Sequence, residues 1–452
     1  MRFYSTHLKA PIVGFKDAVL NGLAPDGGLY VPEQIKRIDN ELLKVLPHLN
    51  LPEIASELFY HLLAPEFTKQ ELAHIAQKAF NFPVPLRALS ETLNILELFH
   101  GETLAFKDFG ARFLAEIIQK ILPQITKEVL ILVATSGDTG SAVANAFYQK
   151  EGIKVVLLFP KGKVSELQEA QLTSLGENIT PIQIEGTFDD CQAMVKRAFT
   201  DRDLRESFFL SSANSINIAR LLPQTVYYFA AVGEIMKRAT WQSQPIAFTV
   251  PSGNFGNLTA GLIARKLGLP IERFISASND NRIVPAFFET EIFSPKPTIQ
   301  TLSNAMDVGN PSNFDRIISL EEKKGFALLN VWERKQVLIK LKEYLSAFSV
   351  TERDTKNAMK ILFEKYQYIA CPHTAVGFSA YLREMLNNNL DSNQVILSTA
   401  HPAKFKATVE EVLGINIELP NRLKEAIEKR KPPIQLQNEF EELKRFLLDK
   451  ST

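Results

Sequence analysis

Six short apolar runs recur after residue 95, and each is followed by a helical pattern or by a loop that could lead to one. Several runs are apolar on both faces, which is typical of strands buried in a parallel sheet. The alternation therefore predicts α/β units around a parallel sheet. The runs are VLILVAT (129–135), KVVLLFP (154–160), PIQIEG (181–186), IAFTVPSG (246–253), RFISASN (273–279) and QVILSTA (394–400).

The two ends of the chain read differently from this middle part. Residues 1–90 hold the turn-rich segment APDGGLYVP (Ala24–Pro32) and then helical patterns, which predicts a small, mostly helical N-terminal domain. The α/β pattern covers residues 91–430, and residues 431–452 suggest a linker followed by a terminal helix. A chain of 452 residues is too long for one simple core, so several domains are expected.

Charge and composition exclude several functional classes. Lys+Arg and Asp+Glu both number 51, so no global field favours nucleic acid or an anionic membrane. The two cysteines, Cys191 and Cys371, lie far apart, and the seven histidines show no metal-ligand spacing. No run approaches the ~20 apolar residues of a membrane span, and the first residues lack a secretory core. We therefore expect a cytoplasmic protein without a metal site.

Lys107 stands at the start of an amphipathic helical pattern, for which Asp108 is the predicted N-cap. Apolar neighbours and the positive end of a helix both disfavour an ammonium group and lower its pKa. Such an amine is a better nucleophile, as Schiff-base chemistry requires. The alternative is a solvated surface lysine, the usual state of an isolated lysine. The apolar positions of the pattern are Phe109, Phe113, Leu114, Ile117, Ile118 and Ile121.

Two segments have the order strand, glycine-containing turn and helix: ATSGDTG (134–140) and VPSGNFGN (250–257). Free backbone N–H groups at such a helix start can bind a carboxylate or a phosphate. The alternative for each is an ordinary capped turn, in the first case with Asp138 or Thr139 as the cap. Two such turns suggest two anionic groups, for example a cofactor phosphate and a substrate acid. Neither segment matches the dinucleotide or Walker A glycine pattern.

Further polar side chains follow strands or precede helices. Thr399 ends a predicted strand, where its hydroxyl could contact a ligand ring or simply satisfy a turn. Arg220 and Ser215 lie in NSINIARLLPQ (214–224), and arginine suits a phosphate, although an unpaired surface arginine is the open alternative. His373 and His401 are interpreted as structural residues or as residues that support the ligand-binding side chains from behind.

Five motifs together resemble those of threonine synthases of the bacterial type with an N-terminal domain. They occur in order over nearly the whole chain: LFHGETLAFKDFGARF, ATSGDTG, PSGNFGNLTAG, TLSNAMDVGNPSNF and STAHPAKF. The resemblance implies a fold-type-II pyridoxal-phosphate enzyme, similar to the tryptophan synthase β subunit. Such a chain has two open α/β lobes with the cofactor between them, the smaller lobe spanning roughly residues 110–220.

The resemblance also implies roles for the cofactor-binding residues. Lys107 would carry pyridoxal 5'-phosphate as a Schiff base and act as base and acid during turnover. Thr399 would face the pyridine nitrogen, and Asp138 would face the cofactor where many fold-type-II relatives have Asn. The expected phosphate cradle consists of Gly253, Asn254, Phe255, Gly256 and Asn257.

For the substrate, the same resemblance implies two binding groups. The residues expected at its carboxylate are Thr135, Ser136 and Thr139. Ser215 and Arg220 are expected at its phosphate. The implied reaction is β,γ-elimination and β-replacement, which converts O-phospho-L-homoserine and water into L-threonine and phosphate. The expected assembly is a monomer or a homodimer.

Two other functions remain open from the sequence. A related phospho-lyase would release 2-oxobutyrate instead of threonine, and the two reactions differ only in the control of one water molecule. A non-catalytic binder of phosphorylated ligands is the second alternative, although mere binding requires neither Lys107 nor Thr399.

Overall fold

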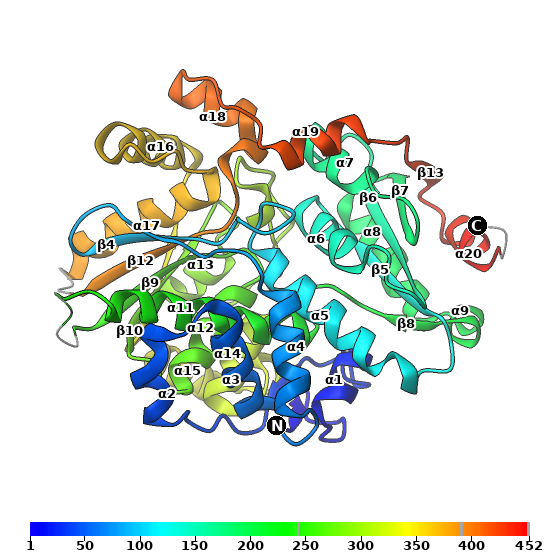
Figure 1. Ribbon diagram of the computed structural model, residues 1–452, viewed down its shortest axis with the longest axis horizontal. Coiled ribbons are helices and arrows are strands. Elements are labelled where there is room, and N and C mark those ends of the chain that lie inside the picture. Colours follow the sequence, from blue (N-terminus) through cyan, green and yellow to red (C-terminus); the bar gives the residue numbers. More distant parts are fainter. Residues whose placement is uncertain (240, 242–243, 389–391, 450–452) are drawn as a thin grey trace.

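The structure is a computed structural model that describes residues 1–239, 241, 244–388 and 392–449. Its strands form two large sheets of six and five strands and one two-stranded pair. In Figure 1 the six-stranded sheet lies at the left and the five-stranded sheet at the right, each covered by helices. The chain thus forms two α/β lobes, which confirms the predicted fold class.

The strands of the described residues are β1 (Phe3–Ser5), β2 (Tyr30–Pro32), β3 (Leu86–Ala88), β4 (Leu93–Glu97), β5 (Val129–Ala134), β6 (Ile153–Pro160), β7 (Ile179–Glu185), β8 (Phe209–Ser211), β9 (Ile246–Pro251), β10 (Ile271–Ser278), β11 (Leu345–Ser349), β12 (Asn393–Ser398) and β13 (Ile434–Gln437). The six-stranded sheet has the order β11-β10-β9-β12-β4-β3 and is parallel except for β3. The five-stranded sheet, β13-β7-β6-β5-β8, is parallel throughout.

The α-helices are α1 (Phe15–Asn21), α2 (Asn40–Val45), α3 (Leu51–Leu63), α4 (Lys69–Ala79), α5 (Lys107–Ile121), α6 (Asp138–Phe147), α7 (Glu166–Thr173), α8 (Phe188–Thr200), α9 (Arg202–Ser207), α10 (Ile218–Leu221), α11 (Thr225–Met236), α12 (Gly256–Lys266), α13 (Ile283–Thr290), α14 (Phe314–Glu322), α15 (Val331–Lys342), α16 (Glu352–Tyr366), α17 (Pro372–Asn388), α18 (Lys406–Leu413), α19 (Asn421–Glu428) and α20 (Phe440–Leu448). None of the helices in the described part of the chain has the length and hydrophobicity of a membrane span.

All six predicted apolar runs form strands, namely β5, β6, β7, β9, β10 and β12. The predicted linker after residue 430 is wrong in part, because Ile434–Gln437 pairs with β7 as an edge strand before α20 begins. This strand has only four residues and one buried side chain, so its sequence carries almost no periodic signal.

One continuous apolar core joins the N-terminal helices to α5 and to both lobes. Phe59 of α3 packs against Phe113 of α5 with ring centroids 4.3 Å apart, and Phe80 contacts both rings. Packing against the N-terminal helices therefore holds in place the helix that begins at Lys107. The domain boundaries at residues 90 and 430 stay predictions.

Replacing Phe113 by alanine should reduce the free energy of unfolding by about 3–5 kcal/mol, because a fully buried ring is lost and a cavity remains. Denaturant titration of the purified variant measures this loss. Tyr60 is the control: it lies on α3, the helix that Phe113 contacts, but the residue is 41% exposed. Its replacement by alanine should cost less than about 1 kcal/mol. Similar losses at both positions would contradict a shared core.

Candidate active site

A cavity of about 1870 Å³ is lined by residues of both lobes and of the N-terminal segment. Its wall includes Leu23 and Gly27 from the turn-rich N-terminal segment and the stretch from Asn304 to Ser312. The structure brings every predicted site residue to this one cavity. These residues are Lys107, Thr135, Ser136, Asp138, Thr139, Ser215, Arg220, Gly253, Asn254, Phe255, Gly256, Asn257 and Thr399.

Lys107 is the first residue of α5, so the helix begins two residues earlier than an N-cap at Asp108 would imply. The prediction of Asp108 as N-cap is wrong: its carboxylate accepts hydrogen bonds from the Thr103 N–H (2.9 Å) and hydroxyl (2.6 Å). The N-cap position belongs to Phe106, whose backbone N–H donates to the Thr399 carbonyl at 2.8 Å. That bond joins the start of α5 to the end of β12, and it places Lys107 and Thr399 in the same region of the cavity wall.

The surroundings of Lys107 shift its protonation equilibrium toward the neutral amine. Burial lowers the pKa of Lys107 to about 8; the Asp138 carboxylate opposes this shift, and the positive charges of Arg220 and Lys404 reinforce it. The alternative of a solvated surface lysine does not fit a side chain that lines the cavity.

The turn between β5 and α6 is organised by Thr135. Its hydroxyl oxygen accepts hydrogen bonds from the N–H groups of Gly137 (3.0 Å) and Gly140 (2.8 Å). Gly137 has a φ of 130°, which only glycine adopts readily. The capping side chain is thus Thr135 rather than Asp138 or Thr139, and Ser136 and Thr139 are half-buried in the cavity wall.

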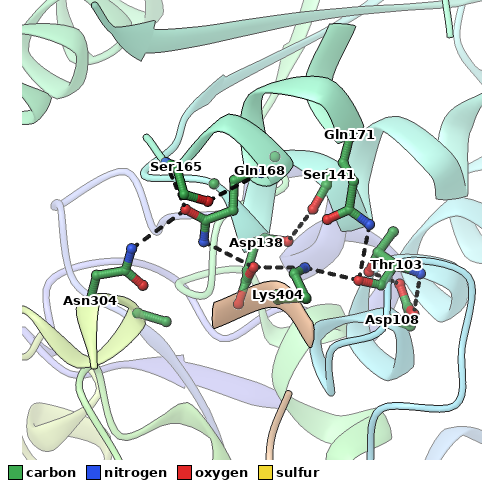
Figure 2. A network of polar contacts seen from close by, with 12 residues as sticks. Thr103, Asp108, Asp138, Ser141, Ser165, Gln168, Gln171, Asn304 and Lys404 are labelled. Carbon is green, nitrogen blue, oxygen red and sulfur yellow. Dashed lines mark hydrogen bonds and ion pairs between the residues drawn. The ribbon is translucent and has the colours of Figure 1, made fainter. Parts of the chain in front are cut away.

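Asp138 forms a buried ion pair with Lys404, which the sequence analysis did not single out (Figure 2). The Lys404 Nζ lies 2.8 Å from Asp138 Oδ1, and the two side chains are 0% and 3% exposed. Burial alone would raise the pKa of the Asp138 carboxyl, but Lys404 and Lys107 hold it far below its usual range. A carboxylate therefore faces the cavity at the start of α6.

The turn between β9 and α12 is braced by its own side chains. Asn257 donates to the Pro251 carbonyl at 2.7 Å and accepts from the Ser252 hydroxyl at 2.7 Å. Asn254 donates to Ser215 Oγ at 2.7 Å and accepts from Ser312 at 3.1 Å.

These amide side chains hold the turn in place, so it is the backbone N–H groups at the start of α12 that are offered to an anion. Phe255 has a φ of 62° directly before the helix begins at Gly256. The first N–H groups of a helix have no partner within it and lie at its positive end. The geometry suits a phosphate.

Thr399 and Ser398 at the end of β12 differ in how their hydroxyls are used. Ser398 Oγ lies 2.8 Å from the Thr374 hydroxyl and accepts from Tyr368 at 3.3 Å. The Thr399 side chain lines the cavity, and its hydroxyl has no hydrogen-bond partner within the described residues. Of the two, Thr399 is the hydroxyl that can bind a ligand.

Arg220 is buried, with 4% of its surface exposed, so the alternative of a surface arginine is wrong. Its guanidinium donates from Nη1 to the Ala213 carbonyl, and its Nε has no hydrogen-bond partner in the described part of the chain. Burial lowers the pKa of Arg220 to about 10, which still leaves it positively charged at neutral pH; the Asp108 carboxylate limits the shift. The cavity wall therefore holds a cation that can attract an anion.

His373 also lines the cavity. Its Nε2 accepts a hydrogen bond from the Ala305 N–H at 3.2 Å, and burial lowers its pKa to about 4, so the ring is neutral at physiological pH. This contact was not predictable, because the sequence does not show that the stretch around Ala305 lies against His373.

Comparison with known proteins identifies the family. Three family models together match nearly the whole chain, the last two with a short overlap: "Threonine synthase N terminus" over residues 2–80, "Pyridoxal-phosphate dependent enzyme" over 81–400 and "Threonine synthase, C-terminal" over 374–447. A threonine synthase of Buchnera aphidicola is 42% identical over 454 residues, covering 100% of both chains.

Solved structures agree with this. The Escherichia coli threonine synthase is 40% identical, with a TM-score of 0.86 over 99% of this chain and 100% of that one. The PLP-bound threonine synthase of Brucella melitensis is 33% identical, with a TM-score of 0.91 over 99% and 98%. The chain therefore belongs to the threonine synthase family of pyridoxal-phosphate-dependent enzymes.

Proposed function

We propose that this chain converts O-phospho-L-homoserine and water into L-threonine and phosphate, with Lys107 as the residue that carries the cofactor and moves protons. One observation supports this most directly: the Lys107 amine and the N-terminus of α12 line the same cavity. An amine for covalent attachment and a phosphate-binding helix start are the two features that pyridoxal phosphate requires.

The residues of the cavity fit this cofactor. The N–H groups that follow Gly253 suit its phosphate, and the Thr399 hydroxyl is free to contact its ring. Asp138 offers a fixed carboxylate to the same cavity. When bound, the cofactor supplies an electron sink that stabilises negative charge at the substrate carbons.

Lys107 has a pKa suited to both attachment and proton transfer. With a pKa of about 8, about a tenth of the amine is unprotonated at pH 7, compared with about 0.03% for an ordinary lysine. An acid–base group works best when its pKa lies near the working pH. We propose that the Lys107 Nζ removes the α-proton of the substrate and returns protons in later steps.

The substrate anions have two proposed binding sites. The start of α6 offers the hydroxyls of Ser136 and Thr139 to the substrate carboxylate. The γ-phosphate is proposed to bind near Ser215 and Arg220, because both line the cavity and the Arg220 guanidinium keeps its positive charge there. Arg220 would then stabilise the negative charge that develops as phosphate leaves.

Product analysis tests the proposal. The purified chain, saturated with pyridoxal phosphate, is incubated with O-phospho-L-homoserine, and threonine, 2-oxobutyrate and phosphate are quantified. We expect threonine and phosphate in equal amounts. A predominance of 2-oxobutyrate would instead identify the phospho-lyase, and no phosphate release would leave only a binding function. The cytoplasmic location and the assembly as a monomer or homodimer stay predictions.

A further inference from the structure

Lys404 is a buried cation beside the proposed active site with no role in the function described so far. It lies in the 3₁₀ helix η6 (Pro402–Phe405), directly after β12 in the six-stranded lobe. Its partner Asp138 begins α6 in the five-stranded lobe. A buried ion pair contributes little stability beyond that of apolar side chains of the same size. Because Asp138 lines the cavity and Lys404 lies directly behind it, the position of the pair points to a role other than stability.

The two oxygens of Asp138 have different surroundings. Oδ1 accepts hydrogen bonds from Lys404 Nζ at 2.8 Å and from Gln168 Nε2 at 3.2 Å. Oδ2 has no hydrogen-bond partner within the described residues, and Asp138 lines the cavity. The carboxylate is thus clamped by one oxygen while the other remains available to a ligand.

Neighbouring side chains fix this arrangement from several elements (Figure 2). Gln168 is held by the capping box of α7, where it bonds with Ser165, and Asn304 donates to Gln168 Oε1 at 3.4 Å. Lys404 also donates to the Thr103 carbonyl at 2.9 Å, and Thr103 in turn holds Asp108 in the first turn of α5. Lys404 is therefore connected both to Asp138 and to the turn that leads into Lys107.

We propose that Lys404 is a positioning residue that cancels the charge of Asp138 at the Lys107 amine and turns the free Asp138 oxygen toward the cofactor site. The inference rests on the proposed function of Lys107 as the attachment point of the cofactor. The Lys404–Asp138 pair contributes no net charge, yet it supplies a fixed acceptor oxygen. The amine beside it consequently stays deprotonated often enough to react at neutral pH.

The charged and titratable groups that face Lys107 determine in which direction each substitution should shift its pKa. They are Asp138 of α6, Arg220 of α10, Lys404 of η6 and the neutral His373 of α17. Without Lys404, the Asp138 carboxylate would be uncompensated and would favour the ammonium form of Lys107. Without the charge of Asp138, the cations Lys404 and Arg220 would disfavour that form further. The two single changes should therefore act in opposite directions.

The test is a mutant cycle read out at Lys107 itself. The full-length chain, freed of cofactor, is treated with a limiting amine-acylating reagent at pH 6–11, and labelling of Lys107 is followed by peptide mass mapping. Only the unprotonated amine reacts, so labelling of the natural chain should rise with a midpoint near pH 8. Lys404→Met should raise the midpoint by about one pH unit or more, and Asp138→Asn should lower it by a similar amount.

The double variant Asp138→Asn/Lys404→Met should return the midpoint close to that of the natural chain, because the net charge is restored. Lys404→Arg, which keeps the charge, should also stay close to it. Lys356→Met is the matched control, since Lys356 forms an exposed ion pair with Glu411 on the surface, and it should shift nothing. Shifts of the same sign in both single variants, or no recovery in the double variant, would overturn the proposal.

The outcome does not depend on turnover. If Lys404→Met fails to fold, the other three variants still test the proposal. Asp138→Asn should lower the labelling midpoint of Lys107, and both the double variant and Lys404→Arg should keep it close to that of the natural chain. Failure of the cycle would leave threonine formation by the natural chain untouched. Conversely, if the chain forms no threonine, the labelling midpoint of Lys107 would still measure the effect of the neighbouring charges.

Discussion

Replacing Lys107 by alanine should lower kcat/KM for threonine formation by about 10³-fold or more while leaving the fold intact. The amine is both the proposed attachment point and the proposed proton carrier, and loss of a positioned acid–base group alone costs about 10²–10⁴-fold. Its side chain lies in a cavity wall rather than in the apolar core, so little packing is lost. Threonine formation at saturating pyridoxal phosphate measures the effect, and thermal unfolding verifies the fold.

One further variant separates the amine from its charge, and a second is a surface control. Lys107→Arg keeps a cation, but a guanidinium neither attaches the cofactor nor loses a proton near neutral pH, so this variant should be as inactive as Lys107→Ala. Lys161→Ala is the control, because Lys161 is 47% exposed and pairs with Glu185 at the surface; it should keep natural activity. Retention of more than about a tenth of the activity by Lys107→Ala would refute the proposed role.

Much of this site could be predicted because its determinants are local. Lys107 is followed by a strong helical period, and the two glycine-containing turns come directly after buried strands. In a parallel sheet the carboxyl ends of strands lie at one edge, so the residues that follow β9 and β12 in the six-stranded sheet converge without further information. The turn after β5 belongs to the other lobe, and the resemblance to the family was needed to bring it to the same site. As a result, the residues that were predicted for the site do line one cavity.

The remaining determinants are contacts between segments far apart in the sequence. Lys404 and Asp138 meet across the two lobes, and no spacing rule relates them. The burial of Arg220 likewise depends on its contact with α5, where the backbone passes close to Gly110. The prediction of Asp108 as the N-cap of α5 was wrong for a different reason. The Asp108 carboxylate accepts hydrogen bonds from Thr103 in the preceding turn, and a pattern of residue types along the sequence does not show this contact.

Gly253→Ala should weaken binding of pyridoxal phosphate by about 10–100-fold, through backbone packing rather than loss of a contact. A Cβ at this position would lie 2.6 Å from the Met306 Cα and 2.9 Å from its carbonyl carbon and oxygen. Backbone atoms cannot rotate away, so either the turn before α12 or the stretch around Met306 must shift. Overpacking of this kind costs about 1–3 kcal/mol, or about 5–140-fold in Kd, and the stated range is the middle of this interval. Spectroscopic titration of the cofactor-free protein measures it.

Gly256→Ala is the matched comparison three residues further along the same turn. Its Cβ would lie 3.6 Å from Asn313 Nδ2, an ordinary contact, and the first helical position accepts alanine well. The backbone N–H is retained in both variants, so a phosphate held by backbone groups should tolerate the second change far better than the first. Equal losses in the two variants would mean that side-chain bulk near the phosphate, and not the close approach at Met306, limits cofactor binding.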